Sequence, residues 1–163
     1  MSLFQRILVP VAFDASTPAA IELACRLATE LGATVDLLHV IDVPESARAD
    51  LESWAAVTAS RAYASDYRGE VEARLRRLAD DLAPRLPRPA ATHVLVGDPA
   101  ATIVHHARER RHDLVVMGAH GRTGVARVFL GSVAERVTRR APCAVLTVRG
   151  AGAEADAGSE AAA

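Results

Sequence analysis

The chain has 163 residues; half are apolar, 24% are charged and the formal net charge is −1. At this length about two-thirds of the unfolded surface can be buried, so one domain is expected to fold without a metal or disulfide, and the near-neutral charge argues against a nucleic-acid partner. No stretch approaches the roughly 20 apolar residues of a membrane span, and no signal peptide is recognisable. Cys25 and Cys143 lie in separate apolar segments and are expected to be free thiols, which favours a reducing cytoplasm. We therefore predict a cytoplasmic protein without membrane contact.

Short runs rich in Val, Ile and Leu alternate with longer segments of helical period. Such runs are typical of parallel strands that are buried on both faces. The alternation predicts a single-domain α/β fold, an open, doubly wound, five-stranded parallel sheet that is Rossmann-like and has helices on both faces. The five expected strands are residues 6–11, Thr34–Ile41, 92–96, 114–117 and Ala144–Val148.

Start and stop signals mark three of the expected helices. Thr17 and Pro18 begin the first, which Gly32 ends. Asp98 and Pro99 begin another, which runs to about residue 111. Ser132 and Glu135 have the spacing of a capping box for the last helix, which ends before Pro142.

Two segments depart from this alternation. Residues 44–68 are longer than a connection requires, and they form either an extended helix of the crossover or a flap over a ligand or partner. The small and acidic residues at 150–163 predict a disordered tail after a domain of residues 1–149.

A glycine-spaced loop follows the fourth expected strand. Gly118, Gly121 and Gly131 lack the Cβ atoms that would hold a ligand away from the backbone, and they permit positive φ values. Ser132 then opens a helix whose free N–H groups and dipole favour an anion. His120 and Arg122 lie within the loop as candidate phosphate contacts, as does Arg127.

These features together resemble the universal stress protein family over about residues 7–149. The resemblance is carried by Ile7-Leu-Val-Pro10-Val, Leu38-His39-Val40, Gly97-Asp98-Pro99, Val115-Val-Met-Gly118, the Gly118-x-x-Gly121 motif followed by Gly131-Ser132, and Pro142-Cys-Ala-Val-Leu-Thr-Val. It implies a five-stranded parallel fold and a homodimer built through the last strand, Ala144–Val148. In the subgroup that carries this glycine signature it also implies ATP binding.

By position, the resemblance implies where a nucleotide would lie. Pro10, Val11 and Val40 would border the base and ribose, and the glycines with Ser132 and Val133 would meet ribose and phosphates. Where ATP-binding members usually have an aspartate this chain has Ala12; Asp14 either substitutes for it or caps the next helix. The candidate cofactor-binding residues are Pro10, Val11, Ala12, Asp14, Val40, Met117, Gly118, His120, Gly121, Arg122, Gly131, Ser132 and Val133.

The resulting hypothesis is a stress-response protein that binds ATP with Mg²⁺ and uses it as a signal, without catalytic residues. The alternatives are a dimeric interaction module that needs no nucleotide, favoured by Ala12, and a slow ATP hydrolase assisted by Glu135 or His120. No metal site is expected, because His105 and His106 are adjacent in a helix and point to different faces, and no further ligands are near them in the sequence.

Overall fold

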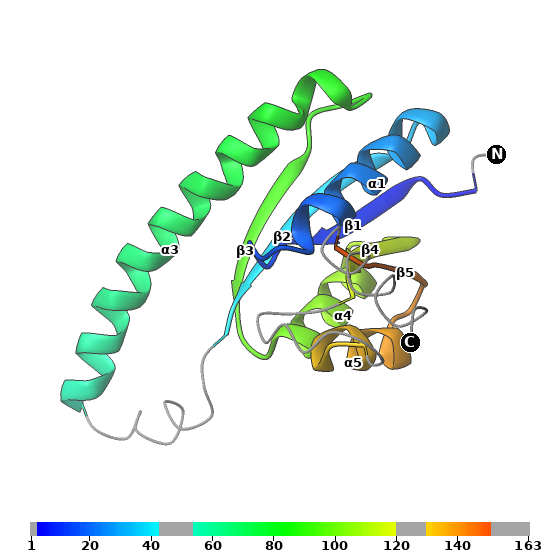
Figure 1. Cartoon of the computed structure of the whole chain (residues 1–163). Coiled ribbons are helices and arrows are strands. Elements are labelled where there is room, and N and C mark those ends of the chain that lie inside the picture. Colours follow the sequence, from blue (N-terminus) through cyan, green and yellow to red (C-terminus); the bar gives the residue numbers. More distant parts are fainter. Residues whose placement is uncertain (1–2, 43–53, 120–129, 151–163) are drawn as a thin grey trace, which may run out of the picture.

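The computed structural model describes residues 3–42, 54–119 and 130–150. Its centre is one parallel sheet in the order β3-β2-β1-β4-β5 (Figure 1). The strands are β1 (Arg6–Pro10), β2 (Thr34–Ile41), β3 (Ala91–Val96), β4 (Leu114–Gly118) and β5 (Ala144–Val148). The predicted five-stranded parallel sheet is therefore confirmed, and the strand bounds differ from the expected ones by one residue at most.

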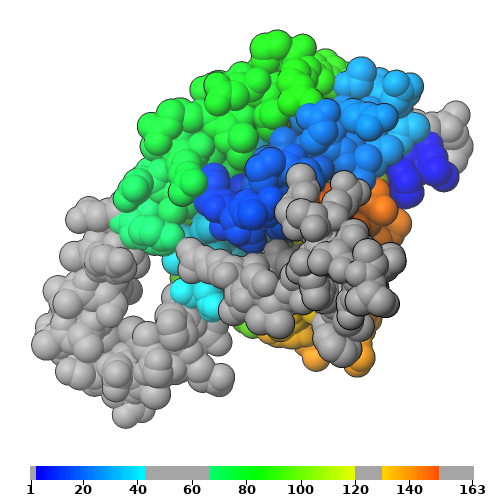
Figure 2. Space-filling view, viewed as in Figure 1, coloured from blue at the N-terminus to red at the C-terminus, as the bar shows by residue number. Residues whose placement is uncertain are grey.

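Helices cover both faces of the sheet. They are α1 (Thr17–Leu31), α3 (Trp54–Leu82), α4 (Pro99–Glu109) and α5 (Ser132–Arg140). α1 and α3 pack on one face, where they lie side by side in the space-filling view (Figure 2), and α4 and α5 pack on the other. Successive residues of β1 alternate between the two cores, so Ile7 is buried under α1 and α3 whereas Leu8 is buried under α4.

The long segment that follows β2 is helical where it is described. α3 begins at Trp54, so the extended-helix interpretation of residues 44–68 holds for 54–68, while 43–53 lie outside the described residues. The predicted disordered tail lies outside them as well, except for Gly150. None of the described helices combines the length and apolar character needed to cross a bilayer.

The direction in which successive strands are added to the sheet reverses after β3, although all five strands are parallel. From β1 the chain winds outward through β2 to β3, and it then returns to the other side of β1 to form β4 and β5. In open parallel sheets the loops on either side of such a switch point diverge, which opens a crevice at the carboxyl ends of the strands. This position in the fold is where a ligand site is expected.

Candidate functional site

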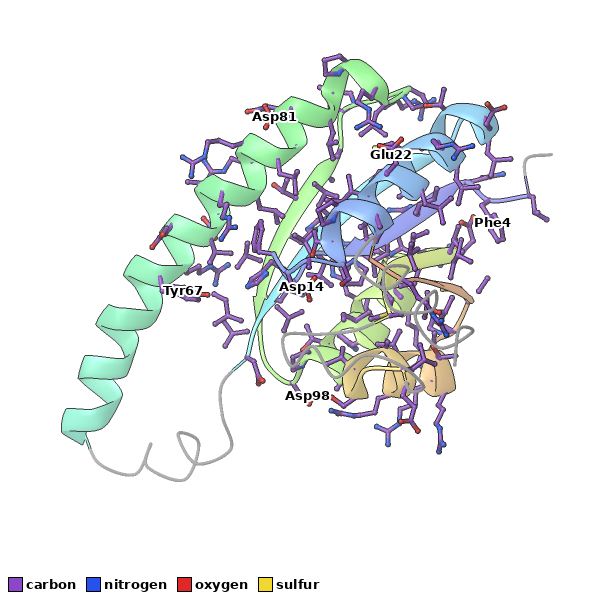
Figure 3. All side chains as sticks on the ribbon, viewed as in Figure 1. Phe4, Asp14, Glu22, Tyr67, Asp81 and Asp98 are labelled. Carbon is purple, nitrogen blue, oxygen red and sulfur yellow. The ribbon has the colours of Figure 1, made fainter. Side chains whose placement is uncertain are left out.

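A crevice of about 480 Å³ lies at this switch point. Its walls are the carboxyl ends of β1, β2 and β4 together with the amino-terminal turns of α4 and α5. Tyr67 adds a wall from α3, on the side of that helix that faces the sheet (Figure 3). The volume suits a small organic ligand, and the helix starts provide N–H groups without helical partners.

Ten of the thirteen residues predicted from the sequence line this crevice. They are Pro10, Val11, Ala12, Asp14, Val40, Met117, Gly118, Gly131, Ser132 and Val133. The other three, His120, Gly121 and Arg122, lie outside the described residues, as does Arg127. The fold thus brings together three separate stretches of sequence that were selected for one ligand.

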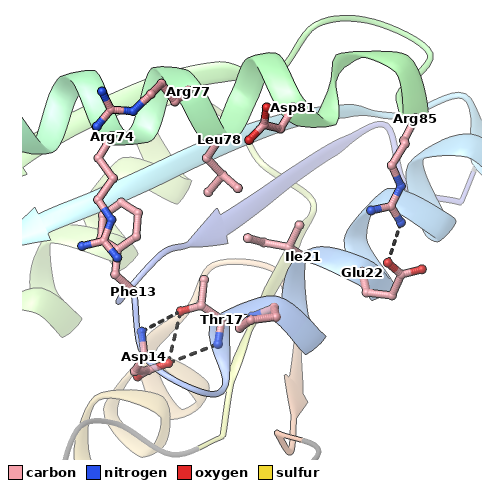
Figure 4. Close-up of a pocket in the computed structure, with 11 residues that line it drawn as sticks. Phe13, Asp14, Thr17, Ile21, Glu22, Arg74, Arg77, Leu78, Asp81 and Arg85 are labelled. Carbon is pink, nitrogen blue, oxygen red and sulfur yellow. Dashed lines mark hydrogen bonds and ion pairs between the residues drawn. The ribbon is translucent and has the colours of Figure 1, made fainter.

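Asp14 organises the turn between β1 and α1. Its Oδ1 accepts hydrogen bonds from the backbone N–H groups and hydroxyls of Ser16 and Thr17, at 2.8–3.1 Å, and Figure 4 shows those from Thr17. Phe13, with φ of 55°, turns the chain into this arrangement. One oxygen of Asp14 therefore serves the turn before α1, whose N-cap residue is Ser16. The other oxygen, Oδ2, is buried without a hydrogen-bond partner among the described residues.

Gly118 serves a purpose other than the predicted one. Its φ is not positive, and a Cβ built on it would lie 1.9 Å from Oγ and 2.6 Å from Cβ of Ser16. The absent side chain therefore makes room for the start of α1 and not for a ligand. Gly131, with φ of −56° and ψ of 150°, also has a conformation that other residues adopt, so neither glycine is needed for positive φ.

This close approach gives a test of how β4 is held against α1. Gly118→Ala is expected to lower the free energy of unfolding by about 3 kcal/mol, because Ser16 or the backbone must move. Ser16→Gly removes both close atoms and leaves the Ser16 carbonyl carbon at 3.5 Å. The double variant should then be as stable as Ser16→Gly alone, within about 0.5 kcal/mol. Urea unfolding of the four proteins measures this; additive losses would contradict it.

The predicted capping box at α5 is wrong. Gly131 is the N-cap, and no side chain among the described residues caps the helix. The Glu135 N–H, which a capping box would pair with Ser132, donates to the Gly131 carbonyl at 2.9 Å. Ser132 is the first helical residue, exposed to solvent at the crevice. The Glu135 carboxylate pairs with Arg139 at 3.0 Å and does not line the crevice. Glu135 therefore adds no negative charge to the walls of the crevice.

Polar residues that the sequence did not select also line the crevice. Ser16, Thr17 and Tyr67 are among them, and so is Asp42 at the end of β2. Tyr67 lies within residues 44–68, and the unusual length of that segment is a sequence signal that could have identified it. The others are scattered through strand ends and helix starts, and no local pattern distinguishes them from residues with a purely structural role. His39 is buried near the end of β2, with its Nδ1–H donating to the Val11 carbonyl at 2.7 Å.

One ion pair fixes the two helix starts of the crevice relative to each other. Asp98 accepts the N–H of Ala101 at 2.8 Å, as a helix cap, and pairs with both terminal nitrogens of Arg136 at 2.6 and 3.0 Å. This links α4 to α5, where Figure 3 labels Asp98. The sequence identified the cap of α4, but not its partner 38 residues away.

A second cavity, of about 590 Å³, lies between α1 and α3 (Figure 4). It is larger than the crevice, but two of the arginines that line it, Arg74 and Arg85, already have partners. Arg74 lies 4.1 Å from the centroid of the Phe13 ring, and Arg85 is hydrogen-bonded to Glu22. We therefore interpret this cavity as a gap between packed helices.

Four polar side chains cluster under α4, outside the crevice. They are Asp36 of β2, His93 of β3, His106 of α4 and His112, which precedes β4. Burial lowers the pKa of His106 to about 4, and the neighbouring His93, His112 and Arg110 act in the same direction. Burial of Asp36 raises its pKa, but the hydrogen bond and charge of His112 outweigh this, so the pKa lies below its ordinary value. The fold thus supplies the neighbours of His106 that the local sequence lacks.

The comparisons with known proteins agree with one another. A model described as the universal stress protein family matches residues 3–149. The universal stress protein MJ0531 of Methanocaldococcus jannaschii is 33% identical over 150 residues, 91% of this chain and 84% of the relative. The solved structure of universal stress protein UspA from Lactobacillus plantarum has a TM-score of 0.66, with 28% identity over 90% of this chain and 98% of that one. A universal stress protein solved in complex with cAMP has a TM-score of 0.66, with 22% identity over 92% and 99% of the two chains.

Proposed function

Because the chain belongs to the universal stress protein family, we propose that it is a stress-response protein that binds ATP with Mg²⁺ in the crevice at the carboxyl ends of the strands. The observation that carries this proposal is the crevice itself. It lies at the β1/β4 switch point, and ten residues selected from the sequence for a nucleotide converge on it. The cAMP complex of a structural relative supports an adenine nucleotide as the ligand class.

The polarity of the crevice suggests how the nucleotide lies. Val11 and Val40 provide apolar walls for the base. The buried Oδ2 of Asp14 lacks a hydrogen-bond donor among the described residues, and a ribose hydroxyl supplies one. The phosphates then extend over the start of α5, where the exposed Ser132 hydroxyl and the first N–H groups point away from the helix.

Charge makes Mg²⁺ part of the proposal. The described walls contain two carboxylates, those of Asp14 and Asp42, and no lysine or arginine. A triphosphate therefore needs cations from elsewhere, and Mg²⁺ bridging phosphate oxygens supplies them. Carboxylates and phosphates are the ligands that Mg²⁺ prefers, so Asp42 would be available to hold it. We expect ATP to bind about tenfold more weakly when Mg²⁺ is removed.

We propose binding without turnover as the biochemical role. A hydrolase needs a base or water-orienting group beside the terminal phosphate. Glu135, one of the two residues considered for slow hydrolysis, pairs with Arg139 outside the crevice. The other, His120, lies outside the described residues. Phosphate release above background that disappears in His120→Ala would establish the hydrolase instead.

The second candidate is a dimeric interaction module that does not use a nucleotide. It is favoured by β5, which is an edge strand of the sheet and exposes 38% of Leu146. We propose that a homodimer forms through this strand in either case. We also propose a cytoplasmic location, in agreement with the free thiols of Cys25 and Cys143.

Calorimetric titration distinguishes the two candidates. Tag-free protein is titrated with ATP, ADP, AMP and cAMP, with Mg²⁺ and with EDTA, and nucleotide carried through purification is identified by mass spectrometry. The proposal expects saturable binding of Mg-ATP with a Kd below about 100 µM. Absence of any adenine-nucleotide binding, with a dimer intact by light scattering, would select the interaction module. Leu146→Arg serves as the control, because it should disrupt the dimer and leave nucleotide binding unchanged.

A further inference from the structure

The polar cluster under α4 brings together residues that are far apart in the sequence. Asp36 lies near the start of β2, His93 faces the same core from neighbouring β3, and His106 descends from the second half of α4. Asp36 and His93 lie in the first halves of their strands, whereas the nucleotide crevice lies at the carboxyl ends and is lined by none of the three. In this part of the structure the α4 core is otherwise built from apolar side chains. A buried polar group at such a place requires a partner.

Contacts within the cluster are short. His112 Nε2 lies 3.0 Å and His93 Nε2 lies 3.5 Å from the same oxygen, Oδ2 of Asp36. The rings of His93 and His106 are tilted by 56° relative to each other, with centroids 4.6 Å apart. One ligand atom from each of Asp36, His93 and His106 lies within 4.8 Å of the other two.

Several of these nitrogens have no hydrogen-bond partner. Among the described residues, Nε2 of His93, Nε2 of His106 and Nδ1 of His112 are buried and form no hydrogen bond. Buried imidazole nitrogens are normally bonded, and two of these three belong to His93 and His106, whose ligand atoms converge with that of Asp36. His106, with 7% of its surface exposed, is too enclosed for bulk water to satisfy it.

We propose that Asp36, His93 and His106 bind a Zn²⁺ ion, with His112 holding the Asp36 carboxylate in place. Two imidazoles and one carboxylate are ligands that Zn²⁺ prefers, and three protein ligands leave a fourth position for water. Mg²⁺ and Ca²⁺ are disfavoured because they prefer oxygen ligands. His112 acts as a positioning residue, since its Nε2–H donates to the oxygen that would bind the metal.

The geometry needs only a small contraction. Metal–nitrogen distances of about 2.0–2.1 Å place tetrahedral ligand atoms about 3.3 Å apart. The 3.5 Å separation of His93 Nε2 from Asp36 Oδ2 is already close to that value. The widest separation in the set closes by at most roughly 1.5 Å, which side-chain rotation provides. The His93 side chain, 18% exposed at an edge strand, provides the route by which the ion enters.

Metal analysis of tag-free, EDTA-treated, full-length protein tests the proposal. After incubation with Zn²⁺ and gel filtration, we expect about one Zn²⁺ per chain. At a free Zn²⁺ concentration one hundred times Kd, Tm should rise by roughly 5–10 °C. Co²⁺ in place of Zn²⁺ should give the visible ligand-field absorption of a tetrahedral nitrogen and oxygen site, a signal that a merely structural histidine does not produce.

Matched histidine variants locate the site. His105→Ala is the control, because His105 is adjacent to His106 but exposed on the outer face of α4. It should retain stoichiometric Zn²⁺, whereas His106→Ala should lose it, and so should His93→Ala at a position that is only partly buried. His93→Ala keeps the test valid if the buried His106→Ala fails to fold. His112→Ala should still bind, with an affinity reduced about 10–100-fold.

Two results would overturn the proposal. One is wild-type protein that takes up no Zn²⁺ and gives no Co²⁺ absorption. The other is equal metal retention by His105→Ala and His93→Ala, which would show adventitious binding to surface histidines. Both readouts are independent of nucleotide, so they do not depend on the proposed function.

Discussion

Gly131→Val should abolish the binding of Mg-ATP, with a loss of affinity of more than about 100-fold. Gly131 lines the crevice at the start of α5, where we place the phosphates. Its φ of −56° and ψ of 150° suit valine, and its backbone bonds to Ala119 and Glu135 do not depend on a side chain. The substitution therefore places an isopropyl group in the crevice without straining the backbone. We expect a stability loss of only about 1 kcal/mol, because valine is a poor N-cap.

A graded pair of substitutions makes this prediction specific. Gly131→Ala adds a single methyl group and should weaken Mg-ATP binding about tenfold, which calorimetry resolves from the complete loss in Gly131→Val. Circular dichroism and thermal unfolding confirm that each variant is folded. If Gly131→Val binds Mg-ATP as the wild type does, the phosphates do not pass over the start of α5. The nucleotide model would then have to be abandoned, although the crevice would remain.

The fold was accessible from the sequence because the central strands β1, β2 and β4 are buried on both faces. Leu8 and Val9 point into different cores, yet both are fully buried, so the middle of β1 has to be apolar. Gly32 marks the end of α1 as predicted, with φ of 66° and its N–H bonded to Ala28. Local signals of this kind do not depend on what packs against them.

The site was accessible only in part. Pro10, Val40 and Gly131 belong to motifs, whereas Ser16 lines the crevice only because Gly118 leaves it room. The histidine cluster was missed for a similar reason. Asp36 and His93 are 57 positions apart and meet through β2–β3 pairing, which no local spacing encodes. Helix and strand periods predict which residues share a face, but not which side chains from different elements converge.

Ala12 illustrates the same limit of local sequence patterns. Where the family resemblance implies an aspartate the sequence has alanine, but the effect of this difference on nucleotide binding depends on the neighbouring side chains. Ala12 is exposed and lines the crevice beside β1. Asp14, the possible substitute, uses Oδ1 for the turn and keeps only Oδ2 for a ligand. In the proposed binding mode this one oxygen has to replace the aspartate that the family resemblance implies at position 12, and nucleotide affinity should be correspondingly reduced.

Ala12→Asp is accordingly expected to tighten nucleoside binding about 10–100-fold. A charge-assisted hydrogen bond contributes about 1.5–3 kcal/mol. Since Ala12 is exposed, the substitution should change the free energy of unfolding by less than about 0.5 kcal/mol. When both ligands are measured in EDTA, the gain in affinity should be larger for adenosine than for ATP. The described walls already carry two carboxylates, and a third repels the phosphates of ATP. Mg²⁺ should restore most of the gain for ATP.

Calorimetry on the pair Ala12→Asp and Ala12→Asn separates charge from geometry. Asparagine keeps an acceptor oxygen at the same position without the charge, so its gain should reach at most about tenfold and should not differ between adenosine and ATP. An Ala12→Asp protein with unchanged adenosine affinity would mean that the nucleoside does not lie against the end of β1. Equal gains for Asp and Asn would mean that the hydrogen bond, and not the charge, limits affinity in the natural protein.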